Sequence, residues 1–138
     1  MNWFVFAFLS AVFAALTTIF AKVGLKGIDS NLATAIRTIV VLVMEWIVVV
    51  ITGAGKAIES LTKTNITFLV LSGLATGLSW LFYFRAVQIG EVSKVVPVDK
   101  FSLVLVLVFS VIALGEPLTW QVIVATILIT AGTFVLLI

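Results

Sequence analysis

The chain has 138 residues, of which 63% are hydrophobic and only 10% charged, and it contains neither cysteine nor histidine. Soluble domains have about 45–50% apolar and about 25% charged residues, so the composition excludes a water-soluble fold of this size and indicates a lipid bilayer as the solvent. Disulfides, metal sites, resident cofactors and histidine-based catalysis are not expected. The net charge of +2, with basic residues spread singly, gives no nucleic-acid footprint.

The first predicted membrane span covers about residues 3–24. It begins at Trp3 without a basic leader, and no small-residue cleavage site follows the apolar run before Lys22. Glycines and lysines at residues 22–27 then favour a helix end at the lipid headgroups. We therefore expect a span here rather than a signal peptide.

The second predicted span covers about residues 31–53 and follows a turn-like segment at residues 27–30. Residues 38–52 alone are too short to cross roughly 30 Å of hydrocarbon, so Arg37 must be drawn into the membrane. Glu45 then lies about 12 Å deeper and is the deepest charge of the chain. A polar connector at residues 56–65 follows, and we expect a short interfacial turn within it.

The third predicted span covers about residues 66–88. Gly73 and Gly77 form a GxxxG pair, which favours close helix packing within the chain and leaves a dimer seam as the alternative. An aromatic stripe at residues 79–84 leads into Arg85 and is more typical of an interfacial belt than of a ligand cage.

The fourth predicted span covers about residues 93–114, and the fifth covers about residues 118–138 after a break at residues 115–117. Residues 101–114 give only about 21 Å of helix, so the fourth span must recruit residues 95–100. Pro97, Asp99 and Lys100 therefore lie at or inside the membrane boundary, where they need partners or a wet cavity. The chain is thus expected to be a single all-α membrane domain, a bundle of about five transmembrane helices.

The distribution of Lys and Arg predicts the orientation. Five spans place the C-terminus with the first and third connectors, on the side that holds most of the basic residues. The cytoplasmic excess of such residues favours an N-terminus outside and a C-terminus in the cytoplasm of a cell membrane. The first set is Lys22, Lys26, Arg37, Arg85, Lys94 and Lys100, and the opposite set is Lys56 and Lys63.

Four ionisable residues at comparable depth, Arg37, Arg85, Asp99 and Lys100, are predicted to form one cluster. Their excess of positive charge would suit an anionic or zwitterionic metabolite, whereas a lipophilic cation would need an unpaired carboxylate. Glu45 and Asp99 are candidate proton-coupling carboxylates. The alternatives are ordinary ones: span-end lysines and arginines can be snorkelling anchors, and Glu45 can face a shallow or wet region.

Two segments resemble the EamA domain of the drug/metabolite transporter superfamily: residues 83–97 (YFRAVQIGEVSKVVP) and residues 114–119 (LGEPLT). Residues 21–25 and 35–37 also look like the start of such a repeat. The resemblance implies that five positions line the central cavity, whereas Glu116 looks like a turn residue. These positions are Arg37, Arg85, Pro97, Asp99 and Lys100, and Tyr83 of the aromatic stripe is added to them as a pathway residue.

Members of this superfamily usually carry ten helices as two inverted five-helix repeats, and this chain resembles one repeat. The resemblance implies a secondary transporter that exports a small metabolite or drug by alternating access. It also implies pairing, as a homodimer or with a second five-helix copy. The alternative is a non-transporting membrane subunit or a component of a lipid-carrier flippase. An intramembrane enzyme is not expected, because Asp99 and Glu45 lack a catalytic partner set.

Overall fold

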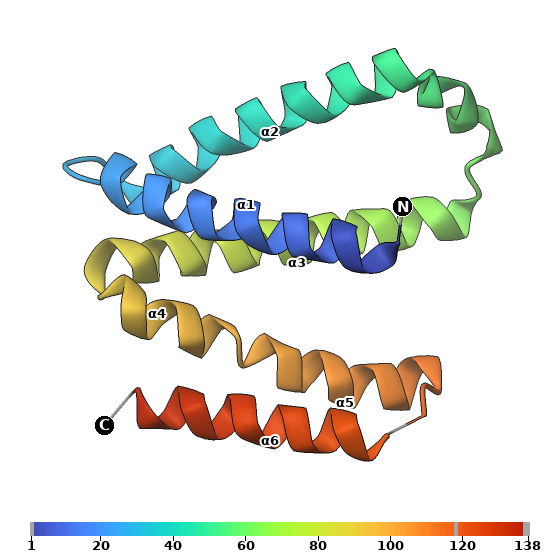
Figure 1. Cartoon of the computed structure of the whole chain (residues 1–138). Helices are drawn as coiled ribbons and strands as arrows, with labels where there is room; N and C mark the ends of the chain where they lie inside the picture. Colours follow the sequence, from blue (N-terminus) through green and yellow to red (C-terminus); the bar gives the residue numbers. More distant parts are fainter. Residues whose placement is uncertain (1, 118, 137–138) are drawn as a thin grey trace. The chain divides into compact units, whose positions relative to one another are not determined.

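The computed structural model describes residues 2–117 and 119–136. Helices follow one another along nearly all of this part of the chain (Figure 1). They are α1 (Trp3–Gly24), α2 (Ser30–Thr52), the 3₁₀ helix η1 (Ala54–Ser60), α3 (Lys63–Ile89), α4 (Val92–Asp99), α5 (Ser102–Leu114) and α6 (Trp120–Val135).

Four segments of the described chain are long and apolar enough to cross a membrane: α1, α2, α3 and residues 92–114, which comprise α4 and α5. A multi-pass membrane protein is therefore the class that the helices define. Helix α6 has 16 residues, or about 24 Å of helix, which is shorter than a span needs. The predicted fifth span begins and ends at residues 118 and 137–138, which lie outside the described residues.

The described chain divides into two compact units, one ending at Gln88 and the other beginning at Ile89. In the first unit, α1 and α3 run parallel, because Thr18 contacts Tyr83 and Lys22 contacts Val87 four residues further along both helices. Helix α2 runs in the opposite direction to α1 and α3, and it lies nearest to them at the end that carries the loop of residues 25–29 (Figure 1). The most buried apolar side chains of this unit, Phe84 and Val87, lie near that same end.

Local signals in the sequence set the bounds of α2. The Asp29 carboxylate caps its N-terminus and accepts hydrogen bonds from the backbone N–H groups of Asn31 and Leu32. Gly53 ends the helix with a φ of 69°, a left-handed conformation that glycine adopts without a steric penalty. The interfacial turn expected in the connector is present as η1, although it begins two residues before residue 56.

The second unit holds α4, α5 and α6, and its first transmembrane segment is broken where a continuous helix is predicted. Pro97 has no N–H group to donate to the carbonyl of Ser93, and the helix ends two residues later at Asp99. The Phe101 N–H then bonds to Val98 rather than to Pro97, at 3.0 Å. The released Pro97 carbonyl instead lies 3.3 Å from the Thr133 hydroxyl of α6, which shares its single hydrogen between Pro97 and the Ile129 carbonyl at 2.9 Å.

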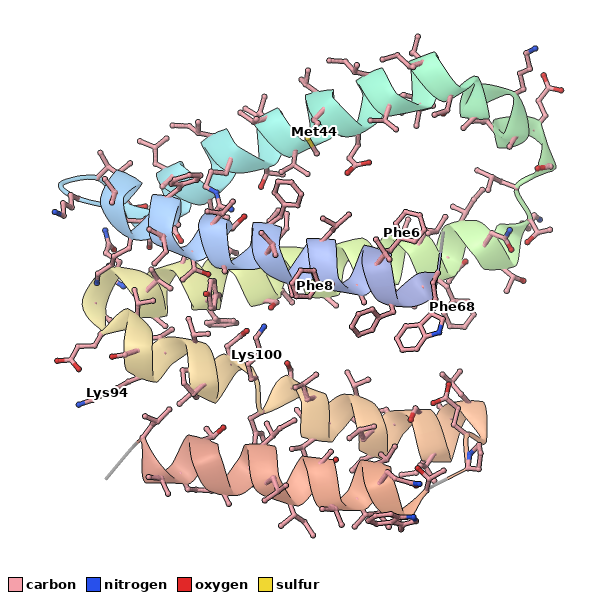
Figure 2. All side chains as sticks on the ribbon, viewed as in Figure 1. Phe6, Phe8, Met44, Phe68, Lys94 and Lys100 are labelled. Carbon is pink, nitrogen blue, oxygen red and sulfur yellow. The ribbon has the colours of Figure 1, made fainter. Side chains whose placement is uncertain are left out.

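Many apolar side chains of the first unit are exposed on the outside of their helices (Figure 2). The side chains of Phe6, Phe8, Met44 and Phe68 are all more than half exposed. An exposed apolar surface of this extent fits contact with lipid rather than with water. The GxxxG pair shows the same openness: apart from the adjacent backbone of α3, a Cβ added at Gly73 or Gly77 would meet no described atom within 4 Å.

Candidate functional site

A pocket of about 390 Å³ opens in the first unit at the end that carries the loop of residues 25–29. This volume falls within the range of about 300–1,000 Å³ that is typical of small-molecule sites. The walls come from α1, the following loop, α2 and α3, and they are almost entirely apolar. The lining residues are Thr17, Phe20, Ala21, Gly24, Leu25, Ile28, Ala33, Ile36, Arg37 and Phe84.

Arg37 is the charged residue of this lining, and it enters the pocket from α2. Its guanidinium carbon lies 3.8 Å from the centre of the Phe84 ring, which is a close cation–π contact. Phe84 itself is 2% exposed and is fixed by edge-to-face contacts with Trp80 and Tyr83. The aromatic stripe of α3 therefore supplies the surface that the guanidinium packs against.

One guanidinium nitrogen of Arg37 lacks an acceptor. Nη1 is buried and has no hydrogen-bond partner in the described part of the chain, although the side chain as a whole is partly exposed. A buried charged donor without an acceptor costs more than about 1–3 kcal/mol, the range for a buried neutral group. The cation–π contact offsets only part of this cost. An acceptor oxygen placed at this nitrogen would satisfy it.

Gln88 fixes the loop wall of the pocket. Its side-chain Nε2 donates to the backbone carbonyls of Leu25, at 3.3 Å, and Ile28, at 2.6 Å. Its Oε1 accepts from Arg85 Nη1 at 2.8 Å. Because Leu25 and Ile28 both line the pocket, Gln88 ties the end of α3 to the segment that closes one side of the site.

Lys22 and Tyr83 hold α1 against α3 next to the pocket. The Lys22 ammonium donates to the carbonyls of Val87, at 2.7 Å, and Gln88, at 3.4 Å, close to the end of α3. The Tyr83 hydroxyl lies 2.7 Å from Thr18 Oγ1. Thr18 already donates to the Ala14 carbonyl, so Tyr83 is the donor in this pair. Both contacts join helices, and neither residue lines the pocket.

The predicted cluster of Arg37, Arg85, Asp99 and Lys100 falls in two units with separate local partners. In the first unit Arg37 lies on Phe84, and Arg85 is exposed and bonded to Gln88. In the second, Asp99 and Lys100 approach each other at 3.8 Å as partly exposed neighbours, a geometry that stabilises little. The role of all four residues in a pathway stays a prediction.

The other predicted residues also have defined surroundings. Pro97 lies in the broken segment and is linked to α6 through Thr133. Glu45 is exposed on α2, 15 residues after Ser30 and seven before Thr52, or about 10 Å from the nearer helix end. It forms no ion pair within the described residues. A proton-coupling role for Glu45 or Asp99 stays a prediction.

Two residues on which the site depends are not among the site residues that the sequence predicts. Phe84 was part of the aromatic stripe interpreted as an interfacial belt, but it is buried and carries the Arg37 guanidinium. In the sequence, Gln88 stands out only as the last residue of the third predicted span. Its spacing of three residues from Arg85 on one helix was a usable signal, since such residues are neighbours on a helix surface.

Apolar helices of spanning length and a pocket of small-molecule size with one charged lining residue define the class as a multi-pass membrane protein with a candidate ligand site. Comparison with known sequences agrees: the sequence model of the EamA-like transporter family matches residues 1–138. The chain belongs to this family, which confirms the resemblance seen in residues 83–97 and 114–119. It is a transporter of the drug/metabolite superfamily, and members of the family are transporters, not enzymes.

One curated relative extends along nearly the whole chain. It is a Sinorhizobium sp protein named "Uncharacterized transporter in cobO 3'region", and it is 45% identical over 135 residues. The match covers 98% of this chain and 96% of the relative. No solved structure matches the chain.

Proposed function

We propose that this chain is one half of a secondary transporter that exports a small organic acid or zwitterion by alternating access. The observation that carries the proposal is the pocket at the loop end of α1, α2 and α3, where a buried guanidinium nitrogen has no acceptor. An apolar cavity with one oriented cation is the usual form of a site for a small anionic ligand.

The proposal includes a membrane topology. We place α6 in a fifth span, with the N-terminus outside the cell membrane and the C-terminus in the cytoplasm. The loop of residues 25–29 is then cytoplasmic, because it lies on the side that holds six of the eight basic residues. The pocket opens near this side, which supports loading from the cytoplasm and hence export.

Two copies would complete the pathway. The resemblance implies two inverted five-helix repeats in a complete pathway, and residues 1–138 correspond to one of them. Two surfaces of the first unit support a partner: the open GxxxG face of α3 and the exposed Glu45 of α2. A charged carboxylate facing lipid is costly within the membrane, so we infer that a second copy or a water path covers Glu45, about 10 Å from the nearer end of α2.

Transport by purified protein in liposomes tests the proposal. Proteoliposomes are loaded with a mixed pool of small metabolites, a pH gradient is applied, and mass spectrometry follows which compounds leave. We expect selective loss of organic acids or zwitterions and a dimer by crosslinking in lipid. Monomers alone, together with no selective efflux, would refute the proposal, and fixed-ratio copurification with a larger enzyme would favour the non-transporting subunit instead.

A further inference from the structure

The charged and polar groups around the pocket select a narrower ligand class than organic acids in general. Among the lining residues, Arg37 is the charged group and Thr17 carries the one side-chain hydroxyl. The remaining walls are aliphatic, aromatic or glycine. We infer that the pocket binds a monocarboxylate with an apolar body, held by the carboxylate on the Arg37 guanidinium. This inference rests on the proposed function only in taking the pocket as the substrate site.

A zwitterion is disfavoured because its ammonium group would find too few acceptors. An ammonium group has three donors, and the side chains of the pocket wall offer one hydroxyl oxygen, at Thr17, and no carboxylate. The nearby loop carbonyls of Leu25 and Ile28 each accept one bond from Gln88, so an ammonium there would have to share an oxygen that is already in use. An ammonium beside the guanidinium would also meet a like charge. The same walls that suit an apolar body therefore reject an amino acid.

A dianion is disfavoured for the opposite reason. One guanidinium can hold one carboxylate through two parallel hydrogen bonds, but a second carboxylate would face apolar wall without a partner. Lys22, the basic residue of α1 next to the lining residue Ala21, does not itself line the pocket. Its ammonium donates to the carbonyls of Val87 and Gln88. The charge count of the site therefore selects a single negative charge.

The geometry also separates a small carboxylate from an anionic phospholipid. A phospholipid with two acyl chains exceeds a cavity of about 390 Å³, so only its head could enter. That would place a polar glycerol phosphate against apolar walls and leave the tails outside. A small apolar carboxylate places each part of the molecule against matching surface.

Binding is tested with matched probes by isothermal titration calorimetry on the full chain in neutral detergent. The probes share one apolar body: 3-phenylpropionate, its amide 3-phenylpropanamide, the zwitterion phenylalanine and the dianion benzylsuccinate. We expect 3-phenylpropionate to bind at least about tenfold more tightly than the other three, because it alone matches the guanidinium without adding an unpaired charge. Equal binding of phenylalanine or benzylsuccinate would overturn the inference.

Variants assign the effect to Arg37. Arg37→Met keeps the length of the side chain and removes the charge, and it should weaken 3-phenylpropionate at least about tenfold. Arg37→Lys keeps the charge but not the planar fork and should fall between the two. Lys26→Gln is the matched control: it removes an exposed charge at the same end without touching the pocket, and its affinity should stay within about twofold of the wild type.

Two further outcomes separate the explanations. If phosphatidylglycerol added to the detergent displaces 3-phenylpropionate completely, or binds in its place, the site is a lipid site and the inference is wrong. The binding assay does not depend on transport. Binding with the expected selectivity but no efflux from proteoliposomes would refute the proposed function alone. Efflux of zwitterions that is unchanged in Arg37→Met would refute this inference alone.

Discussion

Gln88 holds the loop wall of the pocket, and replacing it with methionine should loosen that wall. Methionine has a similar length and suits an apolar surface, but it donates no hydrogen bond. Gln88→Met therefore removes the bonds to the Leu25 and Ile28 carbonyls. Each such bond contributes about 0.5–1.5 kcal/mol, which gives about 2 kcal/mol for the pair. The exposed bond from Arg85 adds little.

Thermal unfolding in detergent, followed by circular dichroism, measures this loss. For a chain of this size about 2 kcal/mol corresponds to a decrease of roughly 4–8 °C in melting temperature. Gln121→Met is the matched control, because Gln121 is exposed on α6, and it should change stability by less than about 0.5 kcal/mol. Gln88→Glu keeps the shape and can pair with Arg85, but it cannot donate to the loop carbonyls when ionised, so it should also be less stable. If both Gln88 variants have the same melting temperature as Gln121→Met, Gln88 does not hold the loop wall.

Three other predictions test the second unit and the intramembrane charges. Glu45→Gln should abolish pH-gradient-driven flux without changing the helical content. Glu59→Gln, in the exposed connector, is the control and should leave this flux intact. If flux through Glu45→Gln still depends on the gradient, Glu45 has no part in proton coupling. Thr133→Val should lower stability by up to about 1 kcal/mol more than Thr130→Val in the same unfolding assay. Both threonines bond to a carbonyl of α6, but only Thr133 shares its hydrogen with the Pro97 carbonyl. The chain has no cysteine, so single cysteines report depth: a membrane-impermeant maleimide should label position 56 in the connector readily and label positions 37, 99 and 100 slowly.

The sequence predicts the helices well because their signals are local. The bounds of α2 follow from the Asp29 cap and Gly53, and both can be recognised in the sequence. Residues 38–52 are too short to span the hydrocarbon, which predicts that Arg37 lies within the membrane. The structure places this same residue at the pocket. The fourth span is predicted as continuous through Pro97, yet the helix breaks at residues 100–101, where the Phe101 N–H bonds to Val98 and the Pro97 carbonyl lies 3.3 Å from the Thr133 hydroxyl. That contact involves a helix more than thirty residues away in the chain.

The partners of Arg37 could not be predicted in the same way. Phe84 and Arg37 are far apart in sequence, and their contact depends on how α2 approaches α3 at the loop end. In lipid this approach is decided by van der Waals packing and a few hydrogen bonds rather than by apolar patterning, since every face of such helices is apolar. Gln88 illustrates the consequence: it supplies the polar link between α3 and the loop, and nothing in its immediate sequence states which carbonyls it will meet. In a chain this apolar, the few buried polar groups therefore determine the site, and each of them must be located in space before its chemistry can be inferred.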